Sequence, residues 1–234
     1  MRLREEPNIS SLIHTFQLMH FVDGDPPPYA ILSHTWEDDE VTRPANEDGL
    51  QWAWVDICCI DKTSSAELSE TINSMFRYYR EAFACYAYLR NPRERTLWNA
   101  RWFTRGWTLQ ELIAPFDVTF YDKNWVQIGA KSQMTTHLEE VTGIPEDILM
   151  HKMRLQDVSV YRRMKWAAWR NTTRIEDAAY CLLGIFDIAI PLLYGEGKMA
   201  FARLQEAIIT RYQDQSLLAW GTVNGDIPTN YVKV

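Results

Sequence analysis

Short apolar segments that suit buried strands alternate with helix-like segments along the first half of the chain, and no other feature restricts the fold as much. The strand-like segments are 29–33, 52–60, 83–89 and 117–122. The second of them, WAWVDICCI, has no polar alternation, which indicates burial on both faces. Strands that alternate with helices predict an α/β fold with a parallel sheet and crossover helices.

The helices are predicted from caps and from apolar spacing. Ser64 and Glu67 form a capping box, and the helix that follows carries one apolar face made of Leu68, Ile72, Met75, Phe76 and Tyr79. A short helix around Glu111 is ended by Pro115. After residue 122 the pattern becomes mainly helical, over 131–142, 157–169, 174–186 and 197–213.

This change of pattern predicts the organisation of the chain. Residues 1–28 form an N-terminal extension, 29–122 an α/β core, 123–220 a mainly helical part and 221–234 a tail. With 234 residues the chain is long enough to bury a substantial core.

Composition excludes several classes of protein. The net charge of -7 argues against a nucleic-acid partner or an anionic membrane surface. The four cysteines lack the spacing of a secreted disulfide framework or a zinc site, so reduced thiols in a cytoplasmic protein are expected. The N-terminus lacks the apolar run of a signal peptide, and the longest apolar stretch is interrupted by Asp187 and Pro191. No membrane span and no metal are therefore predicted.

Polar residues gather where three of the predicted strands end or their following helix begins. These clusters are Ser33-His34-Trp36, Asp56 through Asp61, and Trp107 through Glu111. In open α/β sheets, ligands bind beyond the carboxyl ends of the strands. The three clusters are therefore expected to converge on one crevice.

Each candidate also has a purely structural interpretation. His34 suits a hydrogen bond to a loop carbonyl, Asp56 a turn cap or a pair with an arginine, and Cys58 and Cys59 small buried apolar side chains. Glu111 is by default a solvated helix carboxylate.

Two observations favour a role for Glu111 beyond solvation. Trp107 lies one helical turn earlier, and the segment RWFTRGWTLQEL is too aromatic to be wholly exposed. Burial of a carboxyl group against aromatic rings raises its pKa and suits a catalytic group. Trp102, Phe103 and Leu109 are interpreted as packing residues.

Two weaker patterns remain. A Cys-His nucleophile built from His34 with Cys58 or Cys59 has no local signature to support it. The arginines of 90–105 suit a solvated loop or cations for a phosphate-bearing ligand, and YGEGKMAF (194–201) suits a tight turn into the last helix.

The chain resembles the fungal heterokaryon incompatibility (HET) domain. The resemblance rests on YAILSHTW (29–36), on the segment 54–89 that begins WVDICCIDK, on RWFTRGWTLQELIAP (101–115) and on the segment 172–209 that begins TTRIEDAAYCLLG. It covers residues 29–220 and implies a role in non-self recognition that ends in cell death, in fusion to or pairing with a receptor.

The first half of that family is in turn similar to TIR domains, which implies a flavodoxin-like sheet. RGWTLQEL resembles the TIR segment whose glutamate is catalytic in TIR enzymes that cleave NAD, and that position is Glu111. The resemblance implies NAD or a related nucleotide as substrate, no separate cofactor, and activity through self-association. Glu111 is the expected catalytic residue, and the expected substrate-binding residues are Ser33, His34, Trp36, Asp56, Cys58, Asp61 and Trp107.

One segment departs from the family pattern. Only Glu37–Gln51 joins the first two motifs, where the family usually has a helix, and Pro44, Asn46 and Gly49 make this segment a poor helix. The missing helix would flank the predicted site. The alternative to an NAD-cleaving enzyme is therefore a non-catalytic signalling module that acts by self-association.

Overall fold

The computed structural model describes residues 1–5, 18–21, 26–34, 48–89, 100–212, 214 and 216. One mixed sheet of seven strands runs through this part of the chain in the order β2-β1-β4-β3-β5-β6-β7. The strands are β1 (Arg2–Glu5), β2 (Leu18–His20), β3 (Tyr29–His34), β4 (Trp52–Trp54), β5 (Ala84–Tyr88), β6 (Thr119–Tyr121) and β7 (Gln127–Ala130).

The four central strands are parallel and the outer ones are antiparallel. β4 and β5 flank β3, and β6 pairs with β5, all in parallel. β1 pairs antiparallel with both β2 and β4, and β7 pairs antiparallel with β6. The predicted α/β class with a parallel sheet is thus confirmed for the centre. The sequence predicted no strand in 1–28 or after residue 122, because segments of three or four residues give little pattern.

The predicted strand over 52–60 is wrong beyond its first residues. β4 ends at Trp54, and Asp56–Cys59 form the single helical turn α2. A short apolar run does not distinguish a strand from a buried helical turn by periodicity alone. The chain turns because the Val55 carbonyl accepts the Cys59 N–H at 2.8 Å.

The long helix α3 (Ser65–Glu81) forms as its cap predicts, with Ser64 Oγ accepting the Glu67 N–H at 3.3 Å. Its apolar face packs on one side of the sheet together with the side chains of Ile31, Trp54 and Cys85. The alternate residues Ala30 and Leu32 belong to a smaller cluster on the other face of the sheet. Ser33 therefore shares the helix-covered face with Ile31.

The chain after β5 holds the shorter helices. These are η2 (Arg101–Thr104), α4 (Thr108–Ile113), η3 (Lys131–Gln133), α5 (Thr135–Thr142), α6 (Glu146–Leu149), η4 (Leu155–Asp157), α7 (Val160–Ala167), α8 (Asp177–Tyr180), α9 (Leu183–Phe186) and α10 (Met199–Arg211). Four helical segments were predicted after residue 122, and each contains helix. The segment 174–186 is broken into α8 and α9, whereas β7 and α6 were not predicted.

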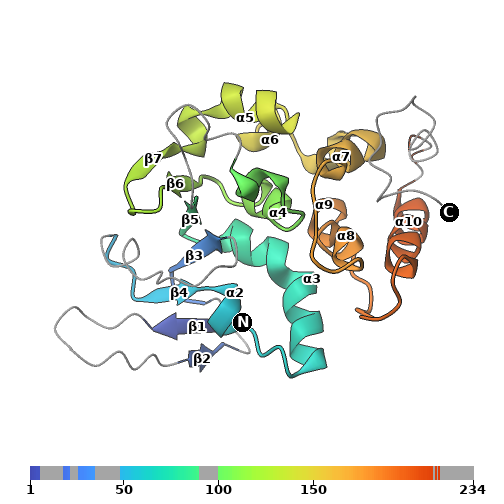
Figure 1. The fold of residues 1–234 in the computed structure, drawn as a ribbon, viewed down its shortest axis with the longest axis horizontal. Helices are drawn as coiled ribbons and strands as arrows, with labels where there is room; N and C mark the ends of the chain where they lie inside the picture. Colours follow the sequence, from blue (N-terminus) through green and yellow to red (C-terminus); the bar gives the residue numbers. More distant parts are fainter. Residues whose placement is uncertain are drawn as a thin grey trace.

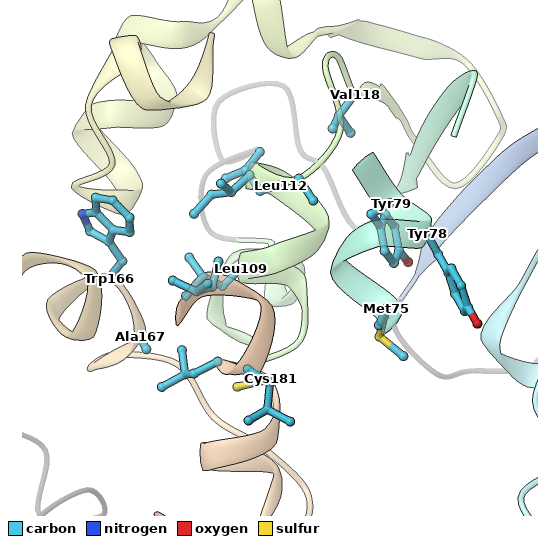
Figure 2. Packing of buried hydrophobic residues seen from close by; sticks show 14 of the residues in the cluster. Met75, Tyr78, Tyr79, Leu109, Leu112, Val118, Trp166, Ala167 and Cys181 are labelled. Atoms are coloured by element: carbon cyan, nitrogen blue, oxygen red, sulfur yellow. The ribbon is translucent and has the colours of Figure 1, made fainter. Parts of the chain in front are cut away.

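Figure 1 shows α4 at the centre of the molecule, between the sheet with α3 and the group formed by α7 to α10. In Figure 2, Leu109 and Leu112 of α4 extend toward Trp166 and Ala167 of α7, while Tyr79 of α3 lies on the opposite side of α4. All six residues of α4 are buried. The helix that carries Glu111 is thus an internal element rather than a surface helix.

Candidate functional site

The Glu111 carboxyl group lies at the carboxyl end of β3, on the helix-covered face of the sheet. Ser33, the penultimate residue of β3, donates its hydroxyl proton to Glu111 Oε2. The same hydroxyl oxygen accepts the indole N–H of Trp102 in η2 at 2.6 Å. The consecutive elements η2 and α4 and the distant strand β3 therefore join in one buried chain of hydrogen bonds.

Burial dominates the chemistry of this carboxyl group. Glu111 is 8% exposed, and desolvation raises its pKa from 4.5 to about 7. The hydrogen bond from Ser33 and the positive charges of Arg105 and Arg170 lower the pKa, whereas the nearby Asp56 raises it. Its pKa is therefore raised toward neutral pH, which suits a reacting carboxyl group.

Asp56 and His34 form a second pair beside Glu111. His34 Nδ1 lies 3.7 Å from Asp56 Oδ1. Burial raises the pKa of Asp56, which His34, Lys62 and Arg105 partly offset, and burial lowers the pKa of His34. Within the described residues, Asp56 Oδ1 is a buried oxygen that accepts no hydrogen bond.

Positive charge borders both carboxyl groups. Arg105 lies half-buried just before α4 and interacts electrostatically with Glu111 and Asp56. Lys62, in the turn after α2, interacts with Asp56. Two acidic and two basic side chains thus share this end of the central strands.

Besides Ser33, whose hydroxyl group contacts Glu111 and Trp102, three of the predicted substrate-binding residues have other contacts. The Asp61 carboxylate accepts the N–H and the hydroxyl proton of Thr63, at 2.9 and 2.6 Å, and so caps a turn. The Trp107 indole hydrogen-bonds to Asp177 in the helical part. Cys58 Sγ lies 3.7 Å from the Val55 carbonyl oxygen. Trp36 lies outside the described residues.

Several residues at the site were not predicted from the sequence. Trp102 was interpreted as a packing residue, and it does pack edge-on against Phe103 and Phe120, with centroids 5.0 and 5.6 Å away. Its N–H contact with Ser33 depends on tertiary structure, so no local pattern reveals it. Lys131 is fully buried and donates to the carbonyls of Leu112 and Pro115, at 3.3 and 2.6 Å, where α4 ends.

The start of α4 is attached to the helical part of the chain. Gly106 donates its N–H to Asn171 at 2.9 Å, and Asn171 donates its N–H to Thr104 at 2.6 Å. The Arg170 guanidinium donates to the Arg105 carbonyl at 3.0 Å and to Thr108 Oγ1 at 2.9 Å. The position of Glu111 therefore depends on both halves of the chain.

Comparison with known proteins agrees with the motifs. Residues 39–98 match the family described as Heterokaryon incompatibility protein (HET). The chain is 43% identical over 245 residues to "Vegetative incompatibility protein HET-E-1" of Podospora anserina, an alignment that covers 89% of this chain. This chain carries a HET domain.

The matches cover different parts of the structure. The HET match contains β4, α2, α3 and β5, and it ends before Glu111. Residues 199–232, which include α10, match a family described as Domain of unknown function (DUF8212). The alignment covers 18% of the Podospora protein's length. No solved structure matches significantly.

Two searches of the described residues bear on possible ligands. None of the helices in that part is long and apolar enough to cross a membrane. Over the same residues, no group of three or more His, Cys, Asp and Glu side chains is arranged to hold a metal ion.

Proposed function

We propose that this HET domain is the cytoplasmic cell-death effector of a fungal incompatibility system and that it hydrolyses the nicotinamide–ribose bond of NAD. The role in incompatibility follows from the name of the Podospora relative, and the greater length of that protein suggests that the domain works fused to or paired with a receptor.

One observation carries the enzymatic part of the proposal. A buried carboxyl group with a pKa near 7 lies at the carboxyl ends of the central parallel strands, held by a hydroxyl group of the strand itself. Numbered along the chain, the parallel strands β4, β3, β5 and β6 have the order 2-1-3-4, the start of the flavodoxin-like order expected of a TIR-like core. The order reverses at β3, where Ser33 and His34 end the strand.

The proposed reaction needs little from the protein. The bond between ribose C1′ and the nicotinamide nitrogen breaks, and nicotinamide leaves as a neutral molecule with the bonding electrons. Water adds to the ribosyl cation at C1′ and loses a proton, which gives ADP-ribose. Ionised Glu111 would stabilise the developing positive charge, as carboxylates do in glycoside hydrolysis. Asp56 or bulk water would accept the proton.

The cations at the site suit the rest of this substrate. Arg105 and Lys62 lie beside the two carboxyl groups and would bind the diphosphate of NAD through charge-assisted hydrogen bonds. His34, Asp56 and Trp36 remain proposed substrate contacts.

The test is release of nicotinamide from NAD by the purified protein, measured by chromatography. We expect turnover by the wild type and a loss of at least about 100-fold in Glu111→Gln, which removes the charge and keeps the shape. The matched control is Glu206→Gln, an exposed glutamate of α10, which should keep wild-type activity.

The assay should cover a wide range of protein concentration, because self-association is proposed to activate the domain. Absence of turnover at high concentration, together with undiminished toxicity of Glu111→Gln in cells, would refute the enzymatic proposal. That result would favour a signalling module that acts by self-association without catalysis.

A further inference from the structure

Ionised Glu111 is held by a chain of hydrogen bonds that runs from Trp102 through Ser33 to the carboxylate. An indole N–H donates and cannot accept, so Trp102 obliges the Ser33 oxygen to accept from it. An ionised carboxylate can only accept, so the single hydroxyl proton of Ser33 is directed to Glu111 Oε2.

The first two members of this chain are buried and packed. Ser33 is 0% exposed and Trp102 is 1% exposed, so bulk solvent does not reach either side chain. Ser33 lies within β3 and its neighbours pair with β5, while Trp102 is fixed edge-on between Phe103 and Phe120. A buried hydrogen-bonded chain of this kind is stronger than an isolated exposed bond.

We propose that Trp102 and Ser33 are positioning residues, which together hold Glu111 Oε2 as an acceptor and keep the carboxylate oriented and charged for the reaction. This inference rests on the proposed function for its catalytic meaning, but the hydrogen-bond chain has consequences that do not require turnover.

The ionisation of Glu111 depends on every group that faces it, and the chain is one influence among several. The other ionisable groups around the carboxyl are Asp56 of α2, Tyr79 of α3, Cys85 of β5, Arg105 before α4, Arg170 after α7 and Cys181 after α8. Removal of a donor to the charged form leaves the opposing influences in place, so the pKa of Glu111 must rise.

The experiment is a pH titration of the Glu111 side-chain carbon by NMR, in protein labelled with ¹³C-glutamate and without NAD. The Glu111 signal is assigned by its loss in Glu111→Gln. We expect Ser33→Ala to raise the pKa by about one unit or more, since it removes the hydroxyl group that donates to Oε2. Ser33→Cys, a weaker donor of similar size, should give a smaller rise.

Trp102→Phe tests the first member of the chain. The Ser33 hydroxyl remains but is no longer constrained by the indole, so the pKa should rise by less than in Ser33→Ala. Trp166→Phe is the matched control for loss of a buried indole, and Thr71→Ala for loss of a buried hydroxyl group. Neither control should shift the Glu111 titration.

Activity gives a second readout. In Ser33→Ala the acid limb of the NAD hydrolysis profile should move to higher pH, with about a tenfold loss below pH 7 for each unit of pKa shift, expressed mainly in kcat.

The outcomes separate the two proposals. If the pKa of Glu111 in folded Ser33→Ala lies within about 0.2 units of the wild-type value, the proposed hydrogen-bond chain is overturned. A shift of one unit would be a tenfold change in the ionisation equilibrium. An unchanged pKa in Trp102→Phe would overturn the part assigned to Trp102. The expected shifts in a protein that releases no nicotinamide would support the hydrogen-bond chain and refute NAD hydrolysis.

Discussion

Glu111 and Glu176 have similar exposed fractions, 8% and 6% of the residue, yet their environments shift the carboxyl pKa in opposite directions. Desolvation raises the pKa of Glu111 to about 7, although the Ser33 hydroxyl group donates to Oε2. Glu176 accepts the N–H groups of Gly195 and Gly197, at 2.8 and 3.0 Å, and these bonds with its own backbone N–H lower its pKa.

The difference lies in how strongly each carboxyl group is desolvated and in how many backbone N–H groups it accepts. Glu176 holds the glycine turn that precedes α10 through these hydrogen bonds. In this turn Gly195 and Gly197 have positive φ angles of 104° and 61°. Such a carboxylate is satisfied and structural. Glu111 is desolvated more strongly than its hydrogen bond and the nearby arginines offset, which destabilises its charged form.

The comparison makes its largest prediction for Glu111→Gln. Folding raises the pKa of Glu111. The contribution of this group to stability is therefore complete below pH 4.5, where it is protonated in both states, and is lost as the pH rises toward 7. At pH 8 the variant should therefore be more stable than the wild type by about 3 kcal/mol, with no difference near pH 4. Urea unfolding at both pH values measures this, and an equal difference at both would contradict it.

Gly106→Ala should disrupt the attachment between the two halves. A Cβ atom at this position would lie 2.5 Å from Thr172 Cγ2 and 3.0 Å from Cys181 Sγ. We expect a loss of about 2 kcal/mol from overpacking, measured by chemical unfolding. The control is the double variant Gly106→Ala with Thr172→Ser, which removes the clashing methyl group and should recover part of the loss.

At pH 8 Glu176→Gln should be less stable than the wild type, whereas Glu111→Gln should be more stable. Its pKa is lowered on folding, so the charged form contributes stability above pH 4.5 that disappears as the pH falls through the folded value. We expect a loss of about 1–2 kcal/mol at pH 8 and a smaller one in acid. Glu206→Gln on the exposed surface of α10 is the control and should change little.

Trp107→Phe gives the smallest effect and separates the two tryptophans of the motif. Trp107 hydrogen-bonds to Asp177 rather than to Ser33, so its loss should reduce the stability by about 1 kcal/mol. The NMR titration of Glu111 should not move, in contrast to Trp102→Phe. A shift as large as that of Trp102→Phe would show that the assignment of the two indoles is wrong.

The central strands and the long helix were predictable because their signals are local. Ser64 caps α3, and Pro115 follows the end of the Glu111 helix, as the sequence indicates. The outer strands β1 and β7 depend on partners elsewhere in the sheet, which no local pattern contains. The proximity of Ser33 and Glu111 was predictable from strand order, whereas the part played by Trp102 was not.

The structure brings together only some of the predicted site residues. The sequence correctly predicted that Asp56 and His34 lie together, because His34 ends one strand and Asp56 follows the parallel strand beside it. It placed Asp61 at the end of a predicted strand and Trp107 one turn before Glu111, and their side chains contact Thr63 and Asp177. The domain boundaries at residues 28, 122 and 220 remain predictions.

The bridge between Arg105 and Asn171 has a consequence for how the molecule opens. The amide protons of Gly106 and Asn171 are held by carbonyls of each other's segments, so neither exchanges with solvent until the two segments separate. Segments 101–115 and 170–181 would then behave as one cooperative unit in hydrogen exchange, although 54 residues of chain lie between them. A fragment that ends at residue 122 would leave the Glu111 helix without one of its walls.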